Sequence, residues 1–233
     1  MTTDISIVVP CYNERENVPL FFYKIEKALS FSNWEIIFVD DNSPDGTIEA
    51  VRELSRFDPR VRGIRRIGRR GLSSAVIEGA MSSSAPLIAV MDGDLQHDEH
   101  CLVPMISSIT QDGYDLVVAS RYLEGGSNGG LTNSWRRFLS NAGRWLARII
   151  LRISLSDPMS GFFVIQRQHF DNRAEKLSRK GFKILLDLIL SDRAALKITE
   201  VPMVFRPRLH GSSKLDWKVM LSFMGLVIRH MKK

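Results

Sequence analysis

The first half of the chain alternates short apolar runs with stretches of helical periodicity. The apolar runs are rich in β-branched residues, which favour strands, and lie at 5–10, 35–41, 61–66, 86–92 and 115–120. Helical patterns lie between them, around 18–29, from Asp45 or Thr47 to about 55, at 71–83 and around 99–111. Strands that alternate with helices predict an α/β fold, in which a mostly parallel central sheet is flanked by helices.

Beyond residue 121 the pattern is less regular. A glycine-rich loop at 124–130 precedes a helical stretch at 135–153, which carries nine apolar residues on one side and four arginines on the other. Further strands are predicted at 160–167 and 198–205, with a helix at 181–191 between them. We expect one domain over 1–215, with halves at 1–121 and 122–215, followed by an amphipathic segment at 216–233.

Two interpretations fit the amphipathic stretch at 135–153. A surface helix packed on the core is the commoner source of such an apolar stripe. However, Trp135 and Trp145 lie on the apolar side and arginines on the other, as in helices that lie in a membrane interface. The C-terminal segment has the same features, and neither segment contains the run of about 18 apolar residues that spans a bilayer. The pattern favours contact with a membrane surface.

Charge is distributed unevenly over the 233 residues, of which 44% are hydrophobic and which carry a net charge of +6. Residues 1–131 hold 12 Lys and Arg against 19 Asp and Glu (−7), whereas residues 132–233 hold 20 against 7 (+13). The first half can therefore host a cation, and the second should attract a phosphate ligand, an anionic lipid or a nucleic acid. The two cysteines, Cys11 and Cys101, predict free thiols in a reducing cytosol.

Residues 91–97, MDGDLQH, place carboxylates at the end of the strand predicted at 86–92. Polar side chains also follow the first two strands, at 12–14 and 40–41. The carboxyl ends of parallel strands lie at one edge of a sheet, where ligands bind, so these groups should meet. Clustered carboxylates repel one another unless a cation or a basic side chain lies among them, and we expect a positive group there.

Several kinds of site could explain Asp92 and Asp94. An EF-hand loop needs a third oxygen ligand followed by glycine, and Gln96 and His97 stand there instead. A cap for the helix at 99–111 needs only one aspartate. A phosphatase with an aspartyl nucleophile also places aspartates after an apolar strand. A divalent metal that holds a diphosphate fits best, because Mg²⁺ and Mn²⁺ prefer hard oxygen ligands such as Asp92, Asp94 and Gln96.

Eight motifs in order extend this interpretation to nearly the whole chain. The motifs are VVPCYNERENV (8–18), VDDNSPDGT (39–47), GLSSAVIEG (71–79), MDGDLQH (91–97), ASRY (119–122), DPMSGFFVI (157–165), GFKILLDL (181–188) and FRPRLHGSSKL (205–215). Together they resemble the family 2 glycosyltransferases with a GT-A fold, and among these the dolichol- and polyprenyl-phosphate mannosyltransferases.

The resemblance implies a role for particular residues of this chain. It implies a nucleotide-sugar pocket formed by Pro10, Tyr12, Glu14, Val39, Asp41, Asp92 and Gly93. It implies a metal region, for Mg²⁺ or Mn²⁺, at Asp92, Asp94 and Gln96. It implies catalytic roles for Asp94, Arg121 and Asp157, although an acceptor that is already ionised needs no general base. A cradle for the acceptor phosphate is expected at Arg206, Arg208, Ser212, Ser213 and Lys214.

The expected activity is the inverting, metal-dependent transfer of a hexose to a polyprenyl or dolichyl phosphate at the cytoplasmic membrane surface. Mannose from GDP-mannose is the favoured donor, with UDP-glucose or another nucleotide sugar as the alternative. A phosphatase and a non-catalytic lipid-binding module are the competing classes. The expected partners are the nucleotide-sugar donor, the lipid phosphate and the membrane surface, without nucleic acid; the oligomeric state is left open. The protein is expected to be peripheral, or the soluble domain of an anchored protein.

Overall fold

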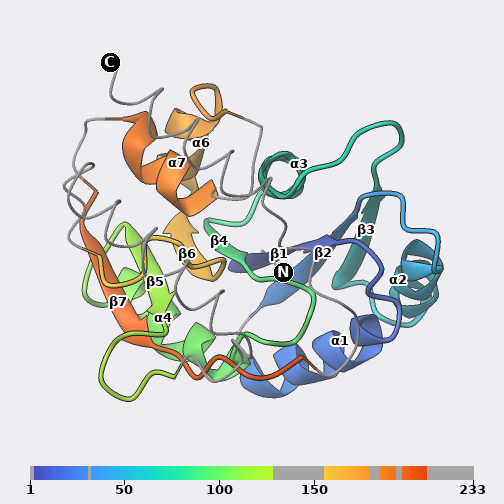
Figure 1. Cartoon of the computed structure of the whole chain (residues 1–233), viewed down its shortest axis with the longest axis horizontal. Helices are drawn as coiled ribbons and strands as arrows, with labels where there is room; N and C mark the ends of the chain where they lie inside the picture. Colours follow the sequence, from blue (N-terminus) through green and yellow to red (C-terminus); the bar gives the residue numbers. More distant parts are fainter. Residues whose placement is uncertain (1–2, 31–32, 128–154, 179–183, 193–195, 209–233) are drawn as a thin grey trace, which may run out of the picture.

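A seven-stranded sheet forms the centre of the molecule in the computed structural model, which describes residues 3–30, 33–127, 155–178, 184–192 and 196–208 (Figure 1). The strands are β1 (Ile5–Cys11), β2 (Trp34–Asp40), β3 (Val61–Arg65), β4 (Leu87–Val90), β5 (Leu116–Ser120), β6 (Phe163–Gln166) and β7 (Ile198–Pro202). Their order in the sheet is β3-β2-β1-β4-β6-β5-β7, and every neighbouring pair is parallel except the two that involve β6. The expected mostly parallel sheet is confirmed.

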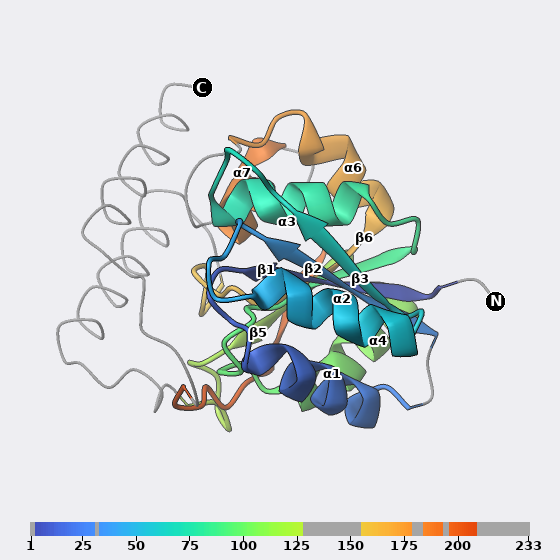
Figure 2. The ribbon, with the colours of Figure 1, turned by 90° about the vertical axis from the view of Figure 1, so that its right-hand side faces the viewer.

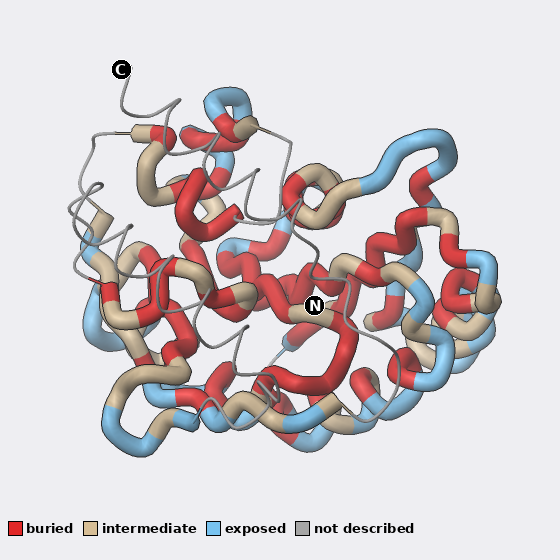
Figure 3. The backbone as a smooth tube through the Cα atoms, in the orientation of Figure 1, coloured by how far each residue is buried: buried red, intermediate tan, exposed pale blue. Residues whose placement is uncertain are grey.

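Helices cover both faces of this sheet (Figure 2). They are α1 (Asn17–Ala28), α2 (Thr47–Phe57), α3 (Leu72–Met81), the 3₁₀ turn η1 (Glu99–Cys101), α4 (Leu102–Thr110), α6 (Arg167–Ala174) and α7 (Ile184–Ser191). Because successive strand side chains point to opposite faces, Ile7 and Val9 of β1 pack with α1, α2 and α4, whereas Val8 packs with α3 and α7. Figure 3 shows the result: buried residues gather in the central sheet, and exposed residues lie mostly at the periphery.

Local chemistry explains where one of the predicted helices begins. The Asp45 carboxylate accepts hydrogen bonds from the Thr47 backbone N–H (3.0 Å) and from the Thr47 hydroxyl (2.6 Å). These bonds satisfy a donor that the first turn of α2 leaves without a helical partner, so α2 begins at Thr47. The helix ends at Phe57, two residues beyond the predicted boundary.

Two predicted strands are shorter than the apolar pattern indicated. The strand expected at 160–167 begins at Phe163, and its last residue, Arg167, instead opens α6. That helix was not predicted, because it is short and polar and buries only Phe170, Arg173 and Ala174. The strand expected at 198–205 ends at Pro202, after which a single bridge joins Val204 to Ser127. The stretch at 135–153 and the segment at 216–233 lie outside the described residues.

The described residues contain no helix with the length and apolar character needed to cross a bilayer. Cys11 and Cys101 are both buried, and no disulfide joins them in the structure.

Close packing between α3 and the sheet requires a glycine at position 79. A Cβ placed on Gly79 would lie 2.9 Å from Cγ2 of Val39, and it would approach the Val8 side chain even more closely. Both valines are fully buried, so neither can move aside easily.

We expect Gly79→Ala to lower the free energy of unfolding by about 1–3 kcal/mol through overpacking, although alanine favours helix by about 1 kcal/mol. Denaturant unfolding followed by circular dichroism measures the change. Met81→Ala on the same helix is the control, because Met81 is 57% exposed and its loss should be nearly neutral. A Gly79→Ala protein at least as stable as the wild type would contradict this account of the packing.

Candidate active site

The predicted site lies along the carboxyl edge of the sheet. β1, β2 and β4 are parallel neighbours, so the loops that follow them emerge side by side. Asn13 and Asn42 both adopt left-handed backbone conformations (φ 57°) where the chain turns away from β1 and β2. The Asn13 backbone N–H donates to the Ser43 hydroxyl (2.9 Å), which joins the two loops. The expected meeting of these polar groups at one edge is confirmed.

Asp41, directly after β2, is held by a buried arginine. Arg66 Nη1 donates to Oδ1 of Asp41 (2.5 Å), and the Gly71 backbone N–H donates to Oδ2 (2.7 Å). Burial raises the pKa of the Asp41 carboxyl, and the hydrogen bond from Gly71 and the charge of Arg66 oppose that rise. Arg66 also donates to the Ser74 hydroxyl (2.5 Å), so the start of α3 is tied to the same group.

The other residues expected around the nucleotide contribute in different ways. The Tyr12 ring lies under the Arg70 guanidinium, 4.5 Å from ring centroid to Cζ. The Glu14 carboxylate accepts from the Asn17 amide (2.6 Å) at the start of α1, which gives it a structural contact. Pro10 and Val39 are register partners in β1 and β2, and the Val39 side chain belongs to the core beneath α3. Val39 can therefore face a ligand only through its backbone.

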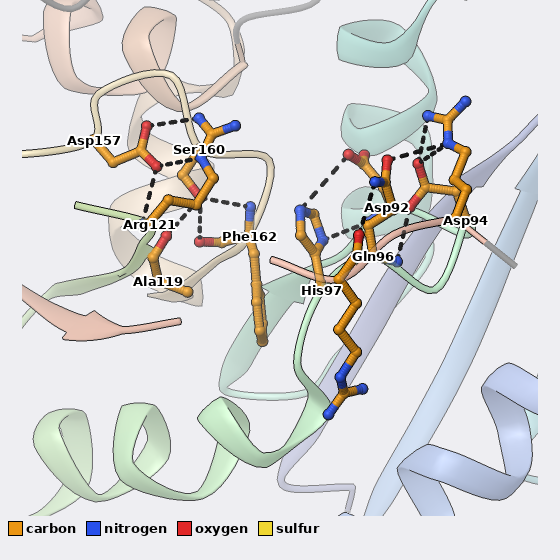
Figure 4. A network of polar contacts seen from close by, with 11 residues as sticks. Asp92, Asp94, Gln96, His97, Ala119, Arg121, Asp157, Ser160 and Phe162 are labelled. Carbon is orange, nitrogen blue, oxygen red and sulfur yellow. Dashed lines mark hydrogen bonds and ion pairs between the residues drawn. The ribbon is translucent and has the colours of Figure 1, made fainter. Parts of the chain in front are cut away.

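The turn after β4 carries Asp92, Asp94 and Gln96 (Figure 4). The Arg208 side chain, from a segment far along the sequence, pairs with Asp94 there. Leu95 has a left-handed conformation (φ 61°), and the Gln96 backbone N–H donates to Oδ1 of Asp94 (3.2 Å). Arg208 Nη2 and Nε donate to Oδ2 of Asp94 at 2.5 and 2.9 Å. Arg208 Nε also donates to the Gln96 side-chain oxygen (3.1 Å). The positive group expected among the carboxylates is this arginine.

The His97 side chain packs against the turn after β4 and contacts Asp92. Its ring stacks on Phe162 (5.4 Å between centroids) and contacts Phe205 (5.8 Å). Burial lowers the pKa of His97 to about 4, so the ring is neutral at pH 7. The Asp92 backbone N–H donates to Nδ1 (3.2 Å), which places the ring proton on Nε2, 3.8 Å from Oδ2 of Asp92. His97 therefore positions Asp92.

The oxygen groups of this turn fit a divalent cation. Asp92, Asp94 and Gln96 offer carboxylate and amide oxygens, which are the donors that Mg²⁺ and Mn²⁺ prefer. Space is kept beside Asp92 by Gly161, since a Cβ there would lie 2.9 Å from Oδ2 of Asp92. A second acidic group, at 98–100, has possible ligand atoms within 4.8 Å of one another, but its carboxylates already pair with Lys24 and Arg206.

Arg121, directly after β5, and Asp157, in the loop before β6, form a buried pair (Figure 4). Arg121 Nε donates to Oδ2 of Asp157 (2.7 Å) and Nη2 donates to Oδ1 (2.9 Å). The side chains are 11% and 1% exposed. Glu200 on β7 holds the loop, because its carboxylate accepts from the backbone N–H groups of Ser156 (2.8 Å) and Asp157 (3.0 Å). The two expected residues thus act as one unit.

The expected phosphate cradle is only partly described. The Arg206 guanidinium donates to Glu99 (2.5 Å) and Asp98 (2.7 Å), so it anchors the segment after β7 to η1. Ser212, Ser213 and Lys214 lie outside the described residues.

Three contributors to this edge were not assigned as site residues from sequence: Arg66, His97 and Glu200. Arg208 was expected in the phosphate cradle, and the structure pairs it with Asp94. The clustered carboxylates did predict a positive partner. Pattern alone could not choose that partner from the 32 lysines and arginines.

Comparison with known proteins decides the family. The model of glycosyl transferase family 2 matches residues 6–173. The chain belongs to glycosyl transferase family 2. This family 2 chain is 38% identical over 233 residues to a dolichol-phosphate mannosyltransferase of Pyrococcus furiosus, covering 98% of the chain and 64% of that relative. It is 34% identical to a dolichol-phosphate mannosyltransferase of Saccharomyces cerevisiae, covering 96% of the chain and 85% of the relative. The expected family is confirmed.

Solved structures share the fold of this family 2 chain. Glucosyl-3-phosphoglycerate synthase of Mycobacterium tuberculosis, in complex with Mn²⁺, UDP-glucose and phosphoglyceric acid, aligns with a TM-score of 0.71 and 18% identity. That alignment covers 99% of this chain and 80% of the synthase. A mannosyltransferase of Pyrobaculum calidifontis, in complex with GDP-Man and Mn²⁺, gives a TM-score of 0.66 at 15% identity and covers 98% of this chain and 65% of its own. The expected GT-A fold is confirmed.

Proposed function

We propose that the protein transfers mannose from GDP-mannose to a dolichyl or polyprenyl phosphate, with inversion at the anomeric carbon. Similarity to dolichol-phosphate mannosyltransferases along nearly the whole chain supports this activity. The observation that carries the proposal is the pairing of Asp157 with Arg121: both carboxylate oxygens of Asp157 accept hydrogen bonds from the guanidinium, so Asp157 is engaged in an ion pair rather than set up as a general base. A phosphate acceptor, with a second pKa of about 6, is already largely dianionic at neutral pH and attacks without a general base. A sugar hydroxyl would need one.

In this proposal the loops after β1 and β2 bind the nucleotide. Tyr12 contacts the guanine ring, and Asp41 accepts from base or ribose donors with the lone pairs that Arg66 and Gly71 leave available. Gly93 lets the backbone approach the donor. Arg121, aimed by Asp157, stabilises negative charge near the reacting centre.

A divalent cation, Mg²⁺ or Mn²⁺, belongs to the same proposal. The oxygens of Asp92, Asp94 and Gln96 would hold it, and the Mn²⁺ complexes of two proteins with this fold support it. When bound, such a cation would neutralise the negative charge that develops on the leaving diphosphate. The chain's own part is to orient these ligands, through His97 for Asp92 and through the turn at Leu95 for Asp94.

The acceptor places the reaction at a bilayer. A polyprenyl tail leaves a membrane only at about 0.8 kcal/mol per buried CH₂, so the protein must reach the lipid. The charge of +13 over residues 132–233 supports attraction to anionic headgroups, and to the acceptor phosphate through Arg206, Ser212, Ser213 and Lys214. We place the protein at the cytoplasmic face of the membrane.

A donor panel tests the proposal. The full chain is incubated with polyprenyl phosphate in liposomes, with GDP-mannose, UDP-glucose or other nucleotide sugars, and with Mg²⁺ or Mn²⁺. We expect lipid-linked mannose from GDP-mannose, and its loss in excess chelator. Lipid-linked glucose from UDP-glucose alone would overturn the donor, and transfer only to phosphoglyceric acid, the ligand of the solved synthase, would overturn the acceptor.

A further inference from the structure

The segment after β7 places an arginine on two of the three proposed metal ligands. Arg208 donates to Asp94 through Nη2 (2.5 Å) and Nε (2.9 Å), and Nε also reaches the Gln96 oxygen (3.1 Å). A guanidinium and a divalent cation would both take lone pairs of these oxygens, and their like charges repel at such short range. They are therefore competitors for one position.

We propose that Arg208 is the resident counter-ion of the metal site, which a divalent cation must displace, and that the displaced guanidinium then serves the substrate phosphates. This inference rests on the metal site of the proposed function. It adds that metal binding and the release of Arg208 are one equilibrium, so that a basic side chain becomes available when the donor and its cation arrive.

The contacts of Arg206 hold the segment after β7 in place, so that the Arg208 side chain can move by itself. The Arg206 backbone N–H donates to the Gln96 carbonyl (2.8 Å), and the Gln96 amide nitrogen donates to the Arg206 carbonyl (2.9 Å). The Arg206 guanidinium is held independently by Asp98 and Glu99. The segment thus stays anchored at Arg206 while the Arg208 side chain, which is 26% exposed, swings out.

The same contacts prepare the ligands for a cation. Since the Gln96 amide nitrogen is committed to the Arg206 carbonyl, its oxygen must face the position that Arg208 occupies. The Asp94 side chain is only 9% exposed, and without a positive partner its buried charge would be costly. Arg208 meets that need in the metal-free state.

Binding of Mn²⁺ to the full chain, without nucleotide, tests the proposal by electron paramagnetic resonance. We expect Arg208→Gln to bind Mn²⁺ about tenfold more tightly than the wild type, the scale of one lost charge-assisted contact. The Mn²⁺ affinity of Arg208→Lys should lie between those of Arg208→Gln and the wild type, because lysine keeps the positive charge but loses the paired N–H donors of the guanidinium. Arg62→Gln controls for net charge, since Arg62 on β3 pairs with Glu35 on β2 and donates to the Ser82 carbonyl, and neither partner belongs to the site. Turnover of Arg208→Gln should fall although its metal affinity rises, a split that a merely structural role would not give.

Asp94→Asn separates the two levels of the proposal. If it abolishes Mn²⁺ binding while Arg208→Gln binds no more tightly than the wild type, the competition is overturned and the metal site stands. If Asp94→Asn binds Mn²⁺ like the wild type, the metal site and the competition are both overturned.

Discussion

Asp94→Asn is expected to reduce the turnover of mannosyl transfer by about 10²–10³-fold, the scale for losing one preorganised electrostatic group at a reacting centre. The carboxylate is buried on the turn after β4, is positioned by the Gln96 backbone N–H, and is the group on which Arg208 rests. Asparagine keeps the shape but removes the charge, so both cation binding and metal-dependent nucleotide binding should fall with it. Initial rates of lipid-linked product formation, with isothermal titration of GDP in Mn²⁺, measure the two effects.

Asp171→Asn is the matched control for this substitution. Asp171 lies on α6 with a side chain that is 43% exposed, so the same chemical change there should leave the rate unaltered. Near-normal turnover by Asp94→Asn in excess chelator would show that Asp94 holds no cation needed for transfer.

Asp157→Ala is expected to lower the free energy of unfolding by about 3–5 kcal/mol, because it leaves the buried Arg121 guanidinium without its partner. Burial lowers the pKa of Arg121, but the hydrogen bonds and charge of Asp157 more than offset this and raise it. The Phe205 and Tyr122 rings, 5.3 and 5.5 Å from the Arg121 Cζ atom, cannot replace a carboxylate. Urea unfolding of the metal-free protein measures the loss.

An exposed ion pair and a double substitution complete that experiment. Glu49→Ala removes the partner of Arg52 on α2, where both side chains are more than half exposed, and should cost about 1 kcal/mol or less. Replacing Arg121 and Asp157 together by Met and Leu should recover much of the stability, but not transfer. If Asp157→Ala were as stable as the wild type and its lost activity returned with added base, Asp157 would be a general base after all.

Local pattern predicted the strands of this protein better than their arrangement. The β-branched run at 35–41 and the apolar run at 115–120 became β2 and β5 with shifts of a residue or so, because strand formation needs only a short apolar segment between turns. The antiparallel insertion of β6 between β4 and β5 has no such signature. The position of β6 depends on which strand edges are still unpaired when the later part of the chain reaches the sheet. That is a property of the assembled fold.

The sequence by itself determined the family, the carboxyl edge and the acidic residues that lie on it, because these follow from the order of elements and from motifs a few residues long. Only the tertiary structure decided their partners. Arg208 reaches Asp94 across 114 positions, Arg121 reaches Asp157 across 36, and Arg66 reaches Asp41 across 25. No periodic pattern along the chain indicates which residues at such sequence separations will pair. These pairings arise in the folded protein. Burial removes a carboxylate from water, and the guanidinium nearest to it in space, rather than in sequence, supplies the hydrogen bonds that water no longer provides.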